Sequence, residues 1–576
     1  MSFNACRSIR PIEWLLAILL LLAPLYFHPN IGGTGLRIPN NILIWAVASI
    51  IGFYSLYKFS QSKIIILPRY ILLLISFPLL TFFSSFFSGV ELAQQWTFRN
   101  LYIWGGVVFL FALFQAQLKG GRIDRLLFVI VLSGLVHALV GIIQILCLKQ
   151  LPIYFPINAS GIPTGLFQQI NNQASFQTTA IIIALWLSSR PFIAKGSSWL
   201  FITLLLAVAC ATFVVTYSGS RVGVLGFIIA FPLMLLSRWH FLKRDCKRLG
   251  LMAFVFIMSI GLASSIESNR GLTSALEKST AVNAGFSGSA RLGMYAIAFD
   301  VIHDAPLFGH GIGSFVRVWQ LGKPAFYAEN PDAKLPAKRV AHPHNETIFW
   351  LVEGGAVTVA GLLLIFIATL LSLKQLPPSR LYAYAALLFP ITLHTQVELP
   401  FYISAEHWFV FLILLFVIFQ PKRYVKTLIL SNSARNLIKI IAISSGTLSL
   451  LFLSHTMAAN LEFKRHIMKN TPIGEEPFSI AMQNPYFKTL ATNTMMSSLF
   501  HSSIKYGLKD NVRLFAEWGK NEIRHNPHFL FYRLTTQAFL FLGESDRACS
   551  IAKEGQSIYP ADMTIKKLIG SCEGIS

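Results

Sequence analysis

Polar side chains that could bind or react with a ligand gather in four short clusters, each beside a long apolar segment. The first cluster, TGLFQQINNQASF, places Gly165, Gln168, Gln169, Asn171 and Asn172 directly before an apolar run. Polar groups at or near membrane depth are energetically costly, so they are functional candidates. These residues could cap a helix, or they could bind groups rich in hydroxyls and amides, such as a sugar.

Two arginines form the centres of the second and third clusters. Arg221 stands in TYSGSRVGVLGF, at a tight turn between two apolar runs, and Arg291 leads the amphipathic stretch SGSARLGMYAIAFDVIHD. A guanidinium group binds two phosphate oxygens at once, so the pair could share a diphosphate. An isolated arginine at this depth could instead reach to lipid head groups. The glycines at 309, 311 and 313 could cradle phosphate, although their spacing alone is a weak signal.

Histidines form the fourth cluster and a further pair. RVAHPHNETIFWLVEGG holds His342, His344 and Asn345 before an apolar run, and HTQVELPFY holds His394 and Glu398 near the end of a later one. A histidine titrates near neutral pH and can accept a proton from an attacking hydroxyl. A metal site is the competing interpretation, but His-x-His without a clear third ligand does not predict one. A lone histidine such as His394 is usually structural.

Membrane-spanning helices must position these clusters. The chain has 576 residues, of which 54% are hydrophobic and 13% are charged, whereas a soluble protein has about 25% charged residues. Apolar runs of about 17–25 residues, enough to cross a bilayer, occur near 12–28, 39–57, 67–88, 100–118, 126–148, 173–189, 198–217, 222–237, 250–266, 346–373, 381–397, 405–420 and 436–456. We therefore predict an all-α polytopic integral membrane protein with about 12–13 transmembrane helices.

The distribution of basic residues predicts the orientation. The chain has 48 Lys and Arg against 25 Asp and Glu, a net charge of +23. These basic residues lie in short clusters between apolar runs, which indicates membrane topology and argues against nucleic acid binding. With the N-terminus in the cytoplasm, the short loops on the opposite side hold only Arg37, Arg99, Lys149 and Arg221. This asymmetry predicts a cytoplasmic N-terminus and a C-terminus on the outside, the periplasm of a Gram-negative cell.

The expected spans divide the chain into four parts. They are N-terminal transmembrane helices at 1–266, a large periplasmic loop with the candidate catalytic motifs at 267–345, C-terminal transmembrane helices at 346–457, and a periplasmic α-helical domain at 458–576.

The last part reads as amphipathic helices. They are broken at Asn526-Pro527, at Gly543 and at Tyr559-Pro560. This order of helix, turn, helix and stop resembles a tetratricopeptide-like helix pair, and an ordinary small helical domain is the alternative. Cys549 and Cys572 could form a disulfide if this part lies in an oxidising compartment.

The serial order of the motifs resembles the O-antigen ligase and polymerase superfamily. The shared elements are an arginine in SGSR, an arginine upstream of APLFGHGIGSF, and HPHNE at the start of a long apolar helix.

Two further motifs are similar to those of one branch of that superfamily. GLFQQINNQA is similar to the pattern Gly-x-x-x-Gln-x-Asn-x-x-Ala, through Gly165, Gln169, Asn171 and Ala174. HTQVELPFY is similar to the pattern His-x-x-x-Glu-x-Pro, through His394, Glu398 and Pro400. This branch is the bacterial O-linked oligosaccharyltransferases of the pilin glycosylase (PglL) type, and the helical tail also fits it.

The resemblance implies an activity and its substrates. The donor would be an undecaprenyl-diphosphate-linked oligosaccharide, transferred to a Ser or Thr hydroxyl of a periplasmic, pilin-like protein at the bacterial inner membrane, with no metal or other cofactor. By position, Arg221 and Arg291 would bind the diphosphate and His344 would be the catalytic histidine. His342 stands on the other side of Pro343 and could be the matching histidine instead, but Asn345 follows His344. Substrate-positioning roles would fall to Gln169, Asn171, His342, Asn345, His394 and Glu398.

Two other functions fit part of the sequence. A ligase that moves glycan to lipid A core, or a polymerase that extends glycan on lipid, differs only in its acceptor, and the Gln-x-Asn motif and the tail argue against both. A transporter of lipid-linked glycans suits the many helices. It predicts no covalent product and does not explain why His and Arg gather on one side of the membrane.

Overall fold

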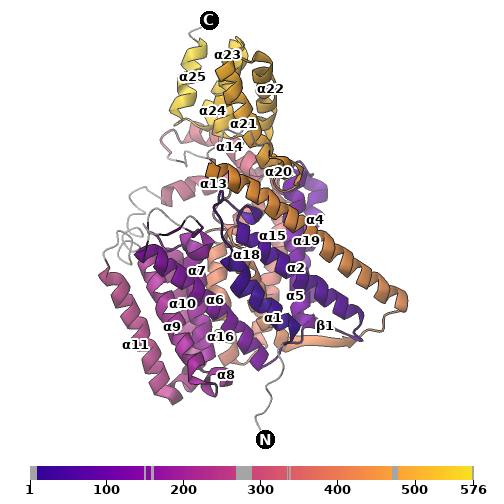
Figure 1. Cartoon of the computed structure of the whole chain (residues 1–576), viewed down its shortest axis with the longest axis vertical. Coiled ribbons are helices and arrows are strands. Elements are labelled where there is room, and N and C mark those ends of the chain that lie inside the picture. Colours follow the sequence, from indigo (N-terminus) through magenta and orange to yellow (C-terminus); the bar gives the residue numbers. More distant parts are fainter. Residues whose placement is uncertain are drawn as a thin grey trace. The chain divides into compact units, whose positions relative to one another are not determined.

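The computed structural model describes residues 10–147, 151–152, 154–156, 161–266, 288–333, 335, 339–469 and 478–573. The described chain is almost entirely helical (Figure 1), which confirms the predicted all-α polytopic class. Eight helical stretches in these residues are long and apolar enough to cross a membrane, and one of them, Arg221–Ser265, contains two of the predicted spans. Shorter apolar helices cover Pro11–Leu25 and Ser76–Ser88.

The chain folds into two compact units, and each unit draws on stretches that are far apart in the sequence. The first unit comprises 1–76, 101–279 and 364–457, and the second comprises 77–100, 280–363 and 458–576. The helices α5 (Ala93–Gln115), α15 (Glu346–Lys374) and α19 (Asn432–Lys469) contribute residues to both units. These two units do not test the division into four parts at residues 266, 345 and 457, which was based on the membrane spans and stays a prediction.

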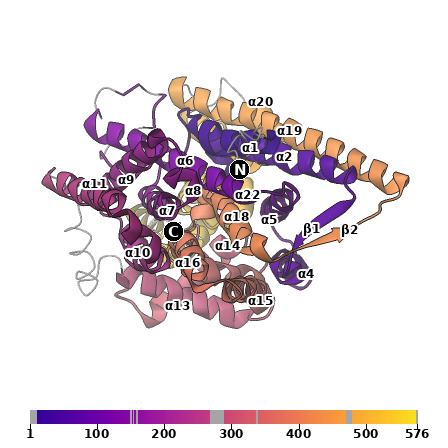
Figure 2. The ribbon, with the colours of Figure 1, turned by 90° about the horizontal axis from the view of Figure 1, so that it is seen from below.

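Nearly all of the predicted spans before residue 266 and after residue 380 form the first unit. Its other helices are α1 (Pro11–Ala17), α2 (Pro39–Ser60), α3 (Ile71–Leu74), α6 (Gly121–Leu146), α7 (Ile170–Ser188), α8 (Pro191–Ala194), α9 (Ser198–Ser218), α10 (Arg221–Leu242), α11 (Cys246–Ser265), α16 (Pro378–Thr395), α17 (Pro400–Ile403) and α18 (Ala405–Phe419). Figure 2 shows α7, α10 and α16 side by side, and all three pairs are in contact.

Small residues allow these helices to approach one another closely. A Cβ atom added to Gly223 of α10 would lie 2.7 Å from the Cβ of Ala174 in α7, and one added to Gly134 of α6 would lie 2.7 Å from the Cβ of Ala180. Glycine and alanine at such contacts bring backbones together, which is how membrane helices gain packing energy without a hydrophobic driving force.

A two-stranded antiparallel sheet joins two loops of the first unit, and the sequence did not predict it. Strand β1 (Ile64–Pro68) pairs with β2 (Arg423–Thr427), with Ile64 opposite Thr427 and Pro68 opposite Arg423. Each strand is too short and too far from its partner in sequence to give a recognisable hairpin pattern.

The second unit contains the C-terminal helices and the region before α15. Its helices are α4 (Ser76–Ser88), α13 (Gly288–Asp304), α14 (Phe315–Glu329), α20 (Ser479–Gln483), α21 (Lys488–Tyr506), α22 (Lys509–His525), α23 (Phe529–Phe541), α24 (Ser545–Ile558) and α25 (Met563–Glu573). Three predicted helix breaks are confirmed, at Asn526-Pro527, Gly543 and Tyr559-Pro560. The tetratricopeptide-like classification stays a prediction.

Cys549 of α24 is disulfide-bonded. The side chain of Cys572 lies outside the described residues, so the pairing of these two cysteines also stays a prediction. The side of the membrane on which the C-terminal helices lie stays a prediction.

The glycine-rich segment after α13 docks on a kink in α15. The N–H of His310 donates to the carbonyl of Val352 at 2.9 Å, and the N–H of Ala356 donates to the carbonyl of Pro306 at 2.9 Å. Gly355 interrupts the helix with φ 64° and ψ −169°, a combination that is essentially restricted to glycine. A Cβ on Gly309 would lie 2.6 Å from the backbone of Glu353. Backbone packing therefore accounts for Gly309, and phosphate binding is not needed to explain it.

Gly355→Ala tests this docking. A Cβ at Gly355 would lie 2.3 Å from the carbonyl oxygen of Leu307, in addition to the backbone strain, so we expect a loss of about 2–3 kcal/mol of stability or failure to fold. Thermal unfolding in detergent measures the effect. Gly261→Ala in α11 is the matched control, because its Cβ meets nothing within 4 Å and should leave stability unchanged or slightly raised. Equal melting temperatures for the two variants would contradict the docking account.

Candidate functional site

The first predicted motif builds the beginning of α7. The side-chain oxygen of Gln169 accepts a hydrogen bond from the N–H of Asn172 at 2.6 Å, so Gln169 caps the helix. Gly165 has φ 57°, and a Cβ there would lie 2.3 Å from Oε1 of Gln173. Both motif residues therefore have a local structural role, which was one of the alternatives open at the level of sequence.

A buried glutamine that the sequence analysis missed holds the loop before α7. Gln144 of α6 donates from Nε2 to the carbonyls of Pro156 at 2.6 Å and Gly165 at 3.0 Å. Its Oε1 accepts from the N–H groups of Thr164 and Gly165, both at 2.9 Å. An amide inside an otherwise apolar span was the available signal, because such a group must find partners within the protein.

Asn171 fastens the start of α7 to the start of α10. The hydroxyl of Ser220 donates to Oδ1 of Asn171 at 2.8 Å, and Ser220 is the N-cap of α10. Arg221 is the first residue of that helix and is exposed. Helix N-termini carry partial positive charge. The start of α10 therefore combines a guanidinium group with a favourable helix end, an arrangement that suits an anion.

The motif that contains His394 is also fastened to α7. His394 is 0% exposed, and its Nδ1 lies 2.7 Å from the hydroxyl of Ser175. Nδ2 of Asn172 donates to the carbonyl of Pro400 at 3.3 Å. The N–H of Glu398 donates to the carbonyl of His394 at 2.9 Å. These contacts give His394 a role in positioning the segment.

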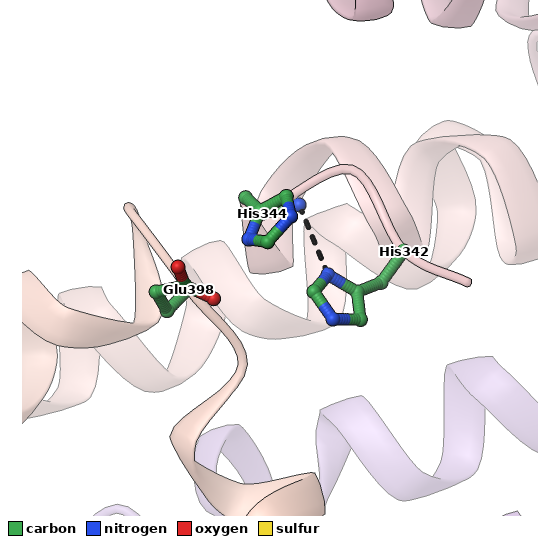
Figure 3. Close-up of side chains that lie close together, drawn as sticks. All are labelled: His342, His344 and Glu398. Atoms are coloured by element: carbon green, nitrogen blue, oxygen red, sulfur yellow. Dashed lines mark hydrogen bonds between the residues drawn. The ribbon is translucent and has the colours of Figure 1, made fainter. Parts of the chain in front are cut away.

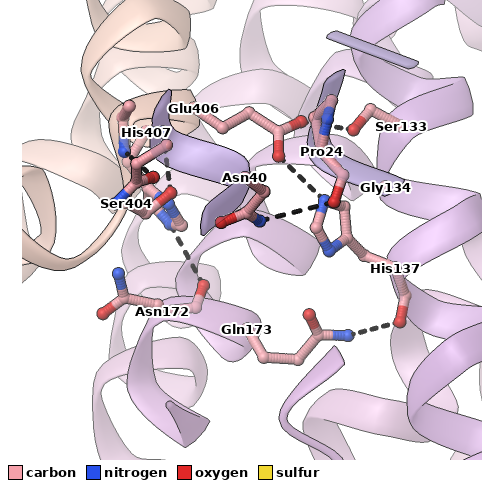
Figure 4. Close-up of polar contacts among 12 residues, drawn as sticks. Pro24, Asn40, Ser133, Gly134, His137, Asn172, Gln173, Ser404, Glu406 and His407 are labelled. Carbon is pink, nitrogen blue, oxygen red and sulfur yellow. Dashed lines mark hydrogen bonds and ion pairs between the residues drawn. The ribbon is translucent and has the colours of Figure 1, made fainter. Parts of the chain in front are cut away.

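A second buried network in the first unit, drawn in Figure 4, joins α6, α7 and α18. Glu406 of α18 is 1% exposed and accepts hydrogen bonds from Ser133 and from His137, whose Nε2 lies 2.8 Å away. Nε2 of Gln173 donates to the carbonyl of His137 at 2.9 Å. His407 lies with Nε2 3.1 Å from the carbonyl oxygen of Asn172. The sequence analysis missed this network, although an ionisable group inside an apolar helix is a signal in itself.

In the second unit, His342 and His344 lie against each other at the entrance to α15, as Figure 3 shows. The N–H of His344 donates to Nδ1 of His342 at 3.4 Å, and the two rings are 4.3 Å apart at 75°. A nitrogen that accepts a hydrogen bond carries no proton, so this contact favours the His342 tautomer that is protonated on Nε2. His344 has φ 56°, a left-handed backbone conformation that is uncommon in residues other than glycine, although histidine adopts it more readily than most.

Asn345 secures this arrangement. Its Oδ1 accepts from the N–H of Ile348 at 2.9 Å and its carbonyl accepts from the N–H of Phe349 at 3.0 Å, which makes it the N-cap of α15. Trp350 then donates from its indole to Glu346 at 2.8 Å. The asparagine therefore fixes where the helix begins and, with it, the backbone of His344.

A partly buried ion pair stabilises the same end of α15. Nη1 of Arg99 lies 2.7 Å from Oε2 of Glu353, which is buried, and the guanidinium lies 4.7 Å from the ring centre of Phe349. The N–H of Phe315 donates to Oε1 of Glu353 at 3.4 Å. The sequence analysis had counted Arg99 only as a charge of an outer loop.

The predicted residues thus fall into two groups, one in each unit. The first unit holds Gln169, Asn171, Arg221, His394 and Glu398, and its contacts bring Asn171 beside Arg221 and the His394 segment beside α7. The second unit holds Arg291, His342, His344 and Asn345. Arg291 lies exposed in the first turn of α13, which packs on α14 through a bond from the indole of Trp319 to the carbonyl of Met294 at 3.0 Å.

Comparison with known families adds two matches. A family model described as "O-Antigen ligase" matches residues 206–366, which include both arginines and the His342–Asn345 segment. A second model, described as "Virulence factor membrane-bound polymerase, C-terminal", matches residues 382–567, which include His394 and Glu398. No curated protein matches the chain.

Substitution of Asn345 separates capping from direct substrate contact. Asn345→Ala should lower stability by about 1 kcal/mol, because the first turn of α15 loses an acceptor, whereas Asn345→Asp keeps the cap and should melt within about 0.5 kcal/mol of the wild type. Thermal unfolding and glycan-transfer assays on the same preparations measure both effects. Loss of transfer in a fully stable Asn345→Asp variant would show that this position does more than cap the helix, because the cap is retained.

Proposed function

We propose that this multi-pass membrane protein, which contains an O-antigen ligase domain and the C-terminal domain of a membrane-bound polymerase, is an O-oligosaccharyltransferase. Its donor is an oligosaccharide linked to undecaprenyl diphosphate. Its acceptor is a Ser or Thr hydroxyl of a pilin-like protein on the periplasmic side of the bacterial inner membrane. The glycan is transferred as one block.

One observation carries the proposal, the 2.8 Å hydrogen bond from Ser220 to Asn171. Asn171 belongs to the motif that resembles the protein-glycosylating branch, and Ser220 precedes Arg221, the proposed diphosphate ligand. The bond supports a mechanical link between the two, because a change at Asn171 would displace the start of α10. Through this bond, the motif that contains Asn171 would affect diphosphate binding by Arg221, a step that the whole superfamily is expected to share.

The proposed reaction is a direct displacement. The acceptor oxygen attacks the anomeric carbon of the first sugar, a carbon–oxygen bond forms, and the bond from that carbon to the diphosphate breaks. The hydroxyl proton passes to His344, a form of base catalysis that contributes about 10²–10⁴-fold. Arg221 and Arg291 stabilise the negative charge that grows on the leaving diphosphate. A single displacement inverts the anomeric configuration.

The remaining site residues act by holding this machinery. Gln169 and Asn171 hold the start of α7, and Asn345 holds the backbone of His344. His342 accepts from the N–H of His344 and so favours one orientation of that backbone. His394 and Glu398 lie in the segment bound to α7. Metal independence remains part of the proposal.

The family match at 382–567 favours a second candidate. Its description names a membrane-bound polymerase, so the acceptor could be a hydroxyl of another lipid-linked glycan, or a lipid A core sugar in the ligase case. The same arginines and histidine would serve, because only the acceptor changes. A transporter of lipid-linked glycans is a third candidate, and it differs in forming no covalent product.

Mass analysis of cells with and without the gene distinguishes these candidates. We expect a glycan mass to disappear from Ser- or Thr-bearing periplasmic proteins on deletion, with lipid A unchanged. Loss of polymer from lipid A with unchanged protein masses would replace the proposal with the ligase or polymerase. No covalent change in either fraction would favour the transporter.

Variants of the three proposed reacting groups test the mechanism. In a purified system with lipid-linked oligosaccharide and acceptor protein, Arg221→Ala, Arg291→Ala and His344→Ala should each lower the transfer rate by about 10²-fold or more. His342→Ala should retain more activity than His344→Ala. Arg244→Ala, an exposed arginine in the link after α10, is the control. Full activity in the folded His344→Ala variant would mean that His344 is not the base.

A further inference from the structure

A cavity of about 570 Å³ opens in the first unit at the ends of α7, α10 and α16. Residues near the last turn of α7 and α10 and the first turn of α16 line it, among them Trp186, Arg238 and Arg380. Gln169, Arg221 and His394 stand at the opposite ends of the same three helices. Helices of this length span about 28 Å at 1.5 Å per residue, close to the apolar thickness of a bilayer. The cavity therefore belongs to the other membrane face.

The side chains of this cavity are held in place. Arg238 is only 4% exposed, and its Nε donates to the hydroxyl of Ser189 at 2.7 Å. The guanidinium groups of Arg238 and Arg190 lie 4.6 Å and 5.1 Å from the ring centre of Trp186. Nε of Arg190 also donates to Asp124 at 3.0 Å. An arginine that only reached to lipid head groups would extend into water, whereas these two are fixed by rings and hydrogen bonds.

The cavity has an excess of positive charge. Arg190, Lys195, Arg238 and Arg380 line it, and none of the described lining residues is acidic. Asp124 binds Arg190 from outside the lining. The hydrogen bonds that the side chains of Arg190 and Arg238 donate to described residues all come from Nε, and the Arg190 side chain is 26% exposed, so terminal nitrogens of both guanidinium groups remain available to a ligand. An anion with several oxygens would bind these nitrogens and offset the repulsion between the cations.

The exposed apolar side chains beside the cavity indicate a lipid. Phe241, about half exposed, forms one wall of the cavity and lies 4.2 Å from the guanidinium of Arg238. On the same helix, Leu236 and Trp239 are exposed apolar side chains that acyl chains could cover. Basic pockets between membrane helices, with tryptophan at the interface, are known to suit phosphate-bearing head groups.

We propose that this cavity binds the phosphate head group of an anionic glycerophospholipid, in the membrane leaflet opposite the catalytic side. The two fixed arginines contact the phosphate oxygens, and Lys195 and Arg380 attract the head group from the rim. By the predicted orientation this is the cytoplasmic leaflet. The proposal does not depend on the transfer reaction, because none of the proposed catalytic residues lines the cavity.

A thermal-unfolding titration of the purified full chain in a neutral detergent tests the site. The probes are short-chain phosphatidylglycerol, phosphatidylcholine with the same chains, and inorganic phosphate. We expect phosphatidylglycerol to raise the melting temperature by about 2–4 °C in a saturable manner, because it binds the folded state. Phosphatidylcholine and inorganic phosphate should give no saturable shift.

Charge-matched variants identify the cavity as the place of binding. Arg238→Gln should raise the half-saturating concentration of phosphatidylglycerol about tenfold, since a bidentate contact is lost. Arg244→Gln removes the same charge from an exposed position just after α10 and should behave as the wild type. If Arg238→Gln does not fold, Arg380→Gln, an exposed rim residue, should show a weaker response than Arg244→Gln.

Three results would overturn the proposal. An equal response of Arg244→Gln and the cavity variants would mean that surface charge alone attracts the lipid. An equal shift with phosphatidylcholine would mean that the head-group phosphate is not recognised as an anionic ligand. A saturable shift with inorganic phosphate that phosphatidylglycerol does not exceed would assign the cavity to a free anion.

Discussion

The fold of the first unit depends on satisfying polar groups inside an apolar bundle. Helix α7 is buried along almost its whole length and still carries asparagine, glutamine, serine and threonine side chains. Without water, each such group must find a partner in the protein or cost several kcal/mol. The observed partners of these side chains lie on α6, α10, α16, α18 and the segment at Pro400. Through these hydrogen bonds, α7 fixes the positions of the neighbouring helices relative to itself.

The proposed catalytic geometry follows from the same requirement. Asn171 and the Ala174–Gly223 contact set the position of α10, and so the position of Arg221. In the second unit the α15 kink at Gly355, the Arg99–Glu353 pair and the Asn345 cap fix the start of α15 beside His344. Asn345 fixes the backbone that directly follows His344, where φ is 56°. The positions of the proposed catalytic side chains therefore depend on residues that are not themselves proposed to react.

Apolar length predicted the all-α polytopic class, and turn residues predicted the C-terminal helix breaks, because both signals are local in sequence. The pairings that hold the site were not predictable in this way. His137 and Glu406, Arg99 and Glu353, and the two strands are each separated by more than about 250 residues, and no local pattern encodes such contacts. The sequence suggested that Gly309 could help to bind phosphate, whereas in the structure glycine is needed there because a Cβ would clash with the backbone of α15. Residue type identified the important positions, while their roles required the structure.

The link between Asn171 and Arg221 is the central claim, and a double-mutant cycle tests it most directly. Donor KM and transfer rate would be measured for Asn171→Ala, Ser220→Ala and the double variant, with thermal unfolding as the control for folding. The account predicts that each single change weakens donor use and that the double change adds little more, a coupling of about 0.5–3 kcal/mol. Fully additive effects would contradict the account, since Asn171 would then act independently of the helix that carries Arg221.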